Sequence, residues 1–351
     1  MQNLGSALYQ DNYSAISKLL HRLALGNRAV AEMSFDIDQT LAKNAPAADV
    51  VGPPVFISGL ARAGTTLLLQ LLFHSGEFRS LTYRDMPFVL APNLWRRIAS
   101  GSRTDMVAEE RAHCDGIKID FDSPEAFEEV FWRVFSGAHY LGDDCLRPMD
   151  ADTALLAQFR GYIAAILNNG SKLRYLSKNN NNILRLNSIQ VAFPTAIIVV
   201  PFRAPLQHAY SLMRQHRLFL REHAQNKFAQ DYMTWLGHHE FGGDHRPFVF
   251  DGIRPRGMPD EDLHYWLQIW CDAHEFLLVN APSNCVFLCY EEFCSNADTA
   301  WPRLLKRLAI DEYALETSLR PVEREIPKPV SAELMARSSE IHSCLIERVS
   351  R

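Results

Sequence analysis

A glycine-bounded turn in the first quarter of the chain carries the residues best suited to chemistry. Residues 55–57 are β-branched or aromatic and predict a buried strand, and the leucine-rich segment from Thr65 onward predicts a helix. Gly59 and Gly64 bound the turn between them. In a strand–turn–helix of this kind, backbone N–H groups and the positive end of the helix dipole converge on one point. The turn is therefore a predicted phosphate-binding site.

This turn lacks the lysine that a nucleoside triphosphate site requires. In an NTP-binding loop with the same Gly-x4-Gly spacing, a lysine follows the second glycine and reaches the terminal phosphates. Here Thr65 stands at that position, and the cation is Arg62, inside the turn. The acid that would help to hold magnesium is also missing, because the clearest buried strand, residues 195–200, leads to Arg203. We therefore expect a different phosphorylated donor and no metal requirement.

A second anion site is predicted where that strand ends. Arg203 leaves the carboxyl edge of the predicted sheet, which is where α/β proteins bind ligands. Pro205 then begins a helix, and Ser211 lies about two turns along it. An arginine and a hydroxyl suit a phosphate group separate from the one in the turn. The two sites together favour a donor of the adenosine 3′,5′-bisphosphate type.

Four segments together resemble the sulfotransferase family, whose donor is 3′-phosphoadenosine 5′-phosphosulfate. They follow the family's order over residues 55–308 and comprise Gly59-Leu-Ala-Arg62-Ala-Gly64-Thr65-Thr66-Leu67, Leu176-Ser-Lys178-Asn179, the stretch from Phe193 to Ser211, and Tyr290-Glu291-Glu292-Phe293 after a late strand. The resemblance implies a P-loop-NTPase-like sulfotransferase fold, an α/β three-layer sandwich around a mostly parallel sheet. It also implies sulfuryl transfer to a hydroxyl, or alternatively an amine, of an acceptor that the sequence does not identify.

The resemblance further implies roles for individual residues. The turn would bind the 5′-phosphosulfate, largely through backbone amides, at Arg62, Ala63, Gly64, Thr65 and Thr66. Arg203 and Ser211 would hold the 3′-phosphate. Lys178 and Arg62 would act in catalysis by steadying charge on the moving sulfuryl group. Because that group carries less charge than a phosphoryl group, these cations and the loop amides can replace a metal ion.

The implied reaction is an in-line displacement, which needs a general base because the acceptor loses its proton as it attacks. Asp85 is the first candidate, since it is the only acid in residues 82–87, about where several family members carry a glutamate. His113 is the second, within an acidic segment that resembles an acceptor-side segment of bacterial members. Glu125, in the same segment, is the third. The choice among them stays open.

The acidic segment also has a purely structural interpretation. Asp122 or Ser123 could cap a helix whose first residue is Pro124. The pattern of residues 124–135 is amphipathic, with aromatic residues on one face. Glu128 and Glu129 would then lie on the solvated face of that helix.

The remaining pattern places these residues on an α/β domain. Short apolar strands alternate with helices through residues 51–320, which indicates βαβ units and a mostly parallel, doubly wound sheet. Residues 1–50 are predicted to form a helical prefix, and residues 321–351 a C-terminal tail. The prefix could cover the core or form a contact between copies, so a homo-oligomer is one expectation.

Residues 223–260 show no clear hydrophobic period and are rich in Gly, His, Pro and aromatic residues. We interpret them as an insertion that forms a lid on the acceptor side, or alternatively as an ordinary structured loop. Residues 235–248 hold three histidines and two acids, but their spacing does not suit tetrahedral zinc. A glycan, a lipid or another small molecule stays open as acceptor, because acceptor pockets lie on loops that a pattern cannot place.

Composition narrows the functional class. The chain has 351 residues, 47% of them hydrophobic and 22% charged, which is ordinary for a globular protein. Its net charge of −5 gives no basic footprint for nucleic acid. No apolar run approaches the roughly 20 residues that span a bilayer, and residues 1–10 lack a secretory pattern. The seven scattered cysteines are typical of free thiols in a reducing compartment, so we expect a cytoplasmic enzyme.

Two rival functions remain. One is a P-loop kinase or nucleotidase that has lost its lysine, against which the missing lysine and strand-end acid both count. The other is a non-catalytic nucleotide- or glycan-binding protein, which would need no base.

Overall fold

The computed structural model describes residues 14–43, 52–99, 122–168, 174–250, 259–311, 313–315, 324–326 and 330–349, together with the backbone of residues 109–110 and 118–119. Its centre is a five-stranded sheet in the order β2-β5-β1-β6-β7. Every neighbouring pair in this sheet is parallel. In chain order the strands are β1 (Val55–Ile57), β2 (Phe78–Arg79), β5 (Arg174–Lys178), β6 (Ile197–Phe202) and β7 (Cys285–Cys289).

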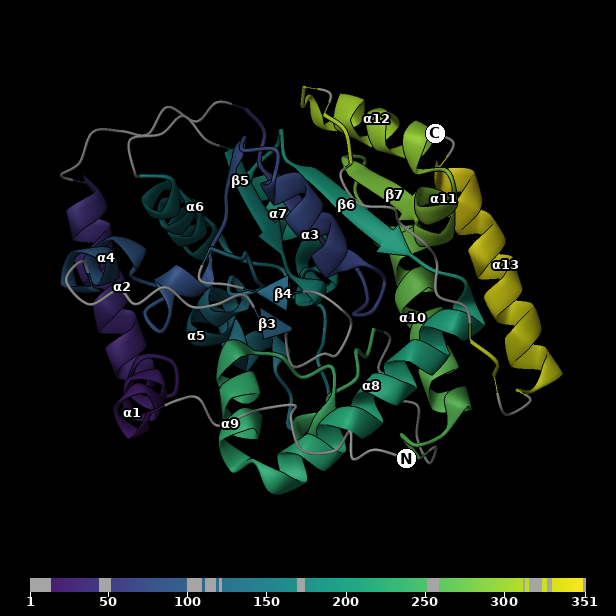
Figure 1. The fold of residues 1–351 in the computed structure, drawn as a ribbon, viewed down its shortest axis with the longest axis horizontal. Helices are drawn as coiled ribbons and strands as arrows, with labels where there is room; N and C mark the ends of the chain where they lie inside the picture. The colour runs from purple at the N-terminus through teal and green to yellow at the C-terminus, as the bar shows by residue number, and fades with distance from the viewer. Residues whose placement is uncertain are drawn as a thin grey trace.

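Helices cover both faces of the sheet (Figure 1). Successive side chains of a strand point to opposite faces, and β1 shows this alternation. Val55 and Ile57 belong to an apolar cluster with residues of α3 (Thr65–Phe73), α11 (Tyr290–Ser295) and α12 (Ala297–Leu308). Phe56 belongs to the larger cluster on the other face. The expected three-layer α/β architecture is confirmed.

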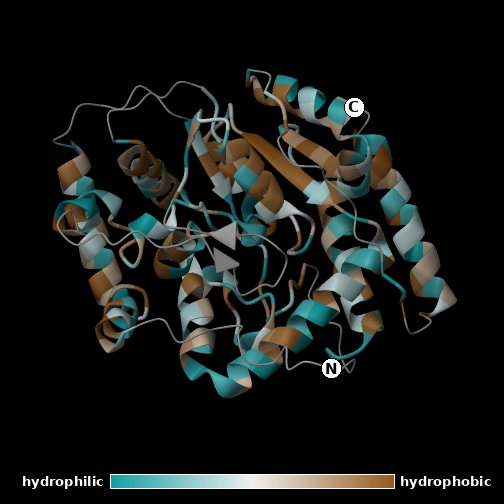
Figure 2. Ribbon diagram, viewed as in Figure 1, coloured by the Kyte–Doolittle hydropathy of each residue, from teal (hydrophilic) through white to brown (hydrophobic). Residues whose placement is uncertain are grey.

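The larger cluster is formed by residues from many helices along the chain and from the strands. Figure 2 shows hydrophobic residues along β6 and β7 and in stripes along several helices. The helix α10 packs against both α8 and α13, and α13 also contacts β7. The helices that contribute to this cluster include α5 (Glu129–Tyr140), α6 (Thr153–Leu167), α7 (Leu186–Ala192), α8 (Pro205–Gln225), α10 (Leu263–Asn280) and α13 (Ala332–Val349).

The described part of the N-terminal segment forms two helices, α1 (Ala15–Ala24) and α2 (Arg28–Lys43). α2 packs against α4 (Pro92–Ala99) and α6, and α1 contacts α9 (Lys227–Leu236). The Asp38 carboxylate of α2 is fully buried and accepts hydrogen bonds from the Asn93 side chain and the Leu94 amide at the start of α4. These contacts join α1 and α2 to the core of the α/β domain.

The predicted helix start at Pro124 is wrong. Residue 124 instead forms an antiparallel bridge with Thr82, and α5 begins at Glu129. The predicted solvated face is wrong as well, because Glu128 is 2% exposed and Glu129 is 0% exposed. Both carboxylates have polar partners from distant parts of the chain, which a local helical pattern does not reveal.

Residues 223–260 contain more regular structure than their composition indicates. α9 occupies residues 227–236, begins at the N-cap Asn226 and ends at Gly237 in the left-handed conformation. A single 3-10 turn, η3 (Gly242–Asp244), follows.

The remaining elements are short. Two further 3-10 helices are η1 (Tyr83–Asp85) and η2 (Asn180–Arg185), and β3 (Glu109–Glu110) pairs antiparallel with β4 (Lys118–Ile119). Among the described residues, no helix combines the length and apolarity needed to cross a membrane.

Candidate active site

The glycine turn connects β1 to α3, as the sequence predicts. Gly64 is the N-cap of α3 and has a φ of 88°. A Cβ at this position would lie 2.6 Å from the Tyr290 ring, so both the backbone conformation and the packing require glycine. Thr65 and Thr66 are buried in the first turn of the helix. The first-turn amides of an α-helix have no partner within the helix, so this loop end can bind an anion.

Three neighbouring strand ends bring the predicted cations to this loop. Parallel strands end at the same edge of a sheet, and β1 lies between β5 and β6. Lys178, the last residue of β5, is in register with Ile57, the last residue of β1. Arg203 follows the last residue of β6 directly. The loop after β1 is therefore flanked by Lys178 on one side and Arg203 on the other.

Lys178 is paired with a carboxylate from outside the sheet. Its Nζ lies 3.5 Å from the Oε1 atom of Glu125, and the two side chains are 8% and 9% exposed. The same Glu125 oxygen accepts a hydrogen bond of 2.9 Å from the Ala126 amide. Of the three predicted base candidates, Glu125 is the one for which the structure describes a contact with Lys178.

A second carboxylate reaches this region from the 223–260 segment. Glu240 accepts a 2.8 Å hydrogen bond from the Nδ2 atom of Asn180, whose Oδ1 lies 3.5 Å from the Thr65 hydroxyl. Burial acts to raise the pKa of Glu240, but electrostatic interactions with His238 and Lys178, together with the hydrogen bond from Asn180, hold that pKa below its ordinary value. Glu240 is therefore an anion beside Lys178. The segment between α9 and η3 thus contributes a charged group to the site.

Arg203 contacts the loop and the segment that follows β7. Its Nη1 atom donates a 3.3 Å hydrogen bond to the Arg62 carbonyl, and its Nε lies 3.5 Å from Glu291 Oε1. The guanidinium also lies 4.7 Å from the centre of the Tyr290 ring. Ser211, the other predicted 3′-phosphate ligand, is partly buried on α8, about 9 Å along the helix axis from Pro205.

The structure places the other base candidates differently. Both carboxylate oxygens of Asp85 are engaged by Arg79, at 2.8 and 2.9 Å. One of them also accepts a hydrogen bond from the Thr82 amide, which closes a capping box around η1. These bonds give Asp85 a structural part in its own turn. His113 lies outside the described residues.

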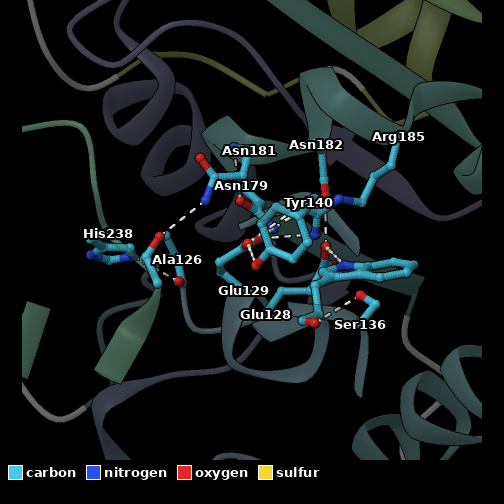
Figure 3. A network of polar contacts seen from close by, with 12 residues as sticks. Ala126, Glu128, Glu129, Ser136, Tyr140, Asn179, Asn181, Asn182, Arg185 and His238 are labelled. Atoms are coloured by element: carbon cyan, nitrogen blue, oxygen red, sulfur yellow. Dashed lines mark hydrogen bonds and ion pairs between the residues drawn. The ribbon is translucent and has the colours of Figure 1, made fainter. Parts of the chain in front are cut away.

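A buried polar network supports the turn that carries Lys178 and Asn180 (Figure 3). Glu129 forms a bidentate ion pair with Arg185 at 3.0 and 3.1 Å, with both side chains fully buried. Asn179, directly after Lys178, donates a 2.7 Å hydrogen bond to the same Glu129 carboxylate. Asn182 donates to Glu128 at 3.0 Å. Two adjacent residues, Glu128 and Glu129, therefore hold the residues that follow β5 in place.

The same network reaches the 223–260 segment. Asn181 donates a 3.0 Å hydrogen bond to the Gly237 carbonyl, and the His238 ring contacts the Ala126 carbonyl at 3.1 Å (Figure 3). Gly237 and His238 are thus tied to the segments that hold Asn180 and Glu125. This arrangement fixes the position from which Glu240 extends.

Sequence reasoning missed Asn180, Glu240 and the support from Glu128 and Glu129. The run of four asparagines after β5 was a usable signal, because short amides next to a strand-end lysine favour local turns and polar contacts. No comparable signal marks Glu240. Among the described residues, no three His, Cys, Asp or Glu side chains group together as metal ligands would.

Comparisons with known proteins bear on these observations. A search of curated protein sequences finds no significant match. Among solved structures, sulfotransferase STF9 from Mycobacterium avium is 16% identical, covering 92% of this chain and 74% of that one, with a TM-score of 0.43. Sulfotransferase STF1 from Mycobacterium tuberculosis H37Rv is 11% identical, with coverages of 97% and 88% and a TM-score of 0.44. A sulfotransferase from Alicyclobacillus acidocaldarius is 12% identical, with coverages of 86% and 97% and a TM-score of 0.42.

The family assignment depends on the sequence. A family model described as "Sulfotransferase family" matches residues 53–246. That range is more than half of the 351-residue chain and contains the loop after β1, Lys178, Arg203 and Ser211. The chain therefore belongs to the sulfotransferase family.

Proposed function

We propose that this protein transfers a sulfuryl group from 3′-phosphoadenosine 5′-phosphosulfate to a hydroxyl of a small-molecule, glycan or lipid acceptor, with an amine as the alternative nucleophile. The observation that carries the proposal is the position of the β1–α3 loop between the Lys178 and Arg203 strand ends. Two separated cationic positions on either side of an anion-binding loop suit a donor that is phosphorylated at both its 3′ and 5′ positions.

Each part of the site has a distinct task in this proposal. The amides at the start of α3, with Arg62, would bind the 5′-phosphosulfate, and Arg203 with Ser211 would bind the 3′-phosphate. Lys178 would offset the negative charge carried by the sulfuryl group and the charge that develops on the bridging oxygen, which leaves with the 5′-phosphate as its bond to sulfur breaks. Burial and the polar network around Glu128 and Glu129 hold these groups in place before the reaction begins. They can therefore stabilise charge with little rearrangement during the reaction.

We further propose Glu125 as the group that accepts the acceptor's proton. A general base must lie within hydrogen-bond reach of the attacking atom, and Glu125 is next to Lys178. Asp85, with both oxygens bound by Arg79 and Thr82, would act in folding its turn. His113 stays an alternative base. Glu240 and His238 would lie on the acceptor side, in keeping with a lid formed by residues 223–260.

Ligand-dependent thermal stability tests this function against the kinase or nucleotidase alternative. We expect adenosine 3′,5′-bisphosphate in the presence of EDTA to raise the melting temperature, because a ligand that binds only the folded state stabilises it by about 2.7 kcal/mol at 100 times its Kd. ATP with magnesium should leave the melting temperature unchanged, since the loop lacks the lysine and the strand-end acid. The reverse pattern in a thermal-shift titration would contradict the proposal.

A further inference from the structure

One buried histidine contacts the donor loop and has no role in the proposed reaction. His208 lies in the first turn of α8, where its amide bonds to the Ala204 carbonyl at 2.9 Å. Its side chain is 0% exposed. Its Nε2 atom lies 2.8 Å from the carbonyl oxygen of Ala61, within the loop. The loop that would bind the 5′ group is therefore held by the helix that begins next to the proposed 3′ site.

Each of three successive backbone carbonyls of the loop has a hydrogen-bond partner. The Leu60 carbonyl accepts from the Ala63 amide at 3.3 Å, the Ala61 carbonyl contacts His208, and the Arg62 carbonyl accepts from Arg203. In a trans peptide unit, the carbonyl of one residue and the N–H of the next point in opposite directions. Fixing the Ala61 carbonyl toward His208 therefore directs the Arg62 amide away from His208.

The backbone of Arg62 explains why the loop needs such support. Its φ is 69°, in the left-handed region that only glycine enters without cost. A conformation of this kind persists only where the surroundings fix it. The bonds from His208 and Arg203 hold the carbonyls on both sides of the strained residue.

The protonation state of His208 follows from its surroundings. Burial, reinforced by the positive charges of Arg203 and Arg62, holds the pKa of His208 well below its ordinary value. Among the described residues, its Nδ1 atom has no hydrogen-bond partner. Because Nε2 faces a carbonyl oxygen, which can only accept, the proton of the neutral ring is on Nε2. His208 thus supplies one donor without adding a third positive charge beside the loop.

We propose that His208 is a positioning residue of the donor site, whose Nε2–H bond to Ala61 keeps the loop in the conformation that binds the 5′ phosphate or phosphosulfate. This inference rests on the proposed function. It goes beyond that function because it proposes that His208, which has no role in binding the donor or the acceptor directly, sets the conformation of the loop.

The chain offers a matched control in His274 of α10. This histidine is also fully buried, and its ring is 6.3 Å from that of His208. Its Nδ1 atom contacts the Trp270 carbonyl of its own helix at 2.7 Å. Leucine at either position therefore removes a buried histidine and its bond to a carbonyl, but only His208→Leu releases the loop.

Calorimetric titration with adenosine 3′,5′-bisphosphate and with adenosine 3′-monophosphate tests the proposal. His208→Leu should weaken bisphosphate binding about tenfold, as expected for the loss of a hydrogen bond to a buried group. It should leave the affinity for adenosine 3′-monophosphate, which has no 5′ group, unchanged. His208→Gln should restore most of the bisphosphate affinity, because its side-chain NH2 can take the place of Nε2–H. His208→Asn, one bond shorter, should not.

The outcomes separate this inference from the proposed function. Unchanged bisphosphate affinity in His208→Leu, or an equal loss in His274→Leu, would overturn the positioning role. An equal loss for both nucleotides would do the same, since it would indicate a general effect on the site. If His208→Leu does not fold, the comparison of His208→Gln with His208→Asn gives the same decision. Failure of the wild-type protein to bind the bisphosphate would instead contradict the proposed function.

Discussion

Replacing Arg185 with methionine should lower the free energy of unfolding by about 3–5 kcal/mol, the usual cost of removing one partner of a buried ion pair. Arg185 and Glu129 are both 0% exposed, and the guanidinium also lies 4.8 Å from the centre of the Trp132 ring and 4.5 Å from that of the Tyr140 ring. Methionine fills similar volume but leaves the Glu129 carboxylate charged and buried. Urea unfolding of the variant and the wild type measures the loss.

Two further variants locate the origin of that loss. The double variant Glu129→Gln with Arg185→Met should recover much of the stability, because no uncompensated charge remains in the core. Arg337→Met removes an arginine that binds Asp272 and Glu275 near the surface, with 32% of its side chain exposed. This control should cost about 1 kcal/mol or less. Equal losses for Arg185→Met and Arg337→Met would contradict the role assigned to the buried network.

Replacing Lys178 with methionine should lower the rate of sulfuryl transfer by about 10²–10³-fold, the range found when one preorganised charge-stabilising donor is removed. The affinity for adenosine 3′,5′-bisphosphate should change little, because this product lacks the sulfuryl group that Lys178 would face. The measurement is the release of the bisphosphate from the phosphosulfate donor, with a hydroxyl acceptor that supports turnover of the wild-type protein.

Lys227→Met is the matched control for this experiment. Lys227 lies at the start of α9, where 73% of its side chain is exposed, and it pairs with Asp231 one turn later. Its replacement removes the same charge from an exposed position of the proposed lid that pairs with Asp231 and not with Glu125, so turnover should be unchanged. A Lys178→Met enzyme with the wild-type rate would show that Lys178 takes no part in the transfer step.

The arrangement of the β1–α3 loop and Arg203 could be predicted from the sequence because its signals are local. Two glycines at a fixed spacing follow an apolar strand, and an arginine ends the clearest buried strand. In a parallel sheet, those two facts are enough to bring the loop and Arg203 to one edge. The register of Ile57 with Lys178 then completes the arrangement.

The support of the site could not be predicted, because its signals are non-local. Glu128 and Glu129 follow a helical pattern that indicates a solvated face. Their burial depends instead on polar partners 50 to 56 positions away in the sequence, namely Asn179, Asn182 and Arg185. The predicted helix start at residue 124 was wrong for a similar reason, since Thr82 binds that backbone as a bridge. The helix α9 could have been predicted, because its N-cap Asn226 and its terminal Gly237 are local signals for a helix start and a helix end, although the segment has no clear hydrophobic period.

The central claim is that the protein recognises a donor phosphorylated at two positions, with Arg203 at the 3′ position. The most direct test is calorimetric binding of adenosine 3′,5′-bisphosphate and adenosine 5′-monophosphate to the wild type and to Arg203→Ala. We predict that the variant loses about 10–100-fold in affinity for the bisphosphate, as expected for charge-assisted hydrogen bonds, and clearly less for the monophosphate, which would lose only the support that the Arg203 bond gives to the Arg62 carbonyl. An equal loss for both nucleotides would contradict the claim, because Arg203 would then not recognise the 3′-phosphate.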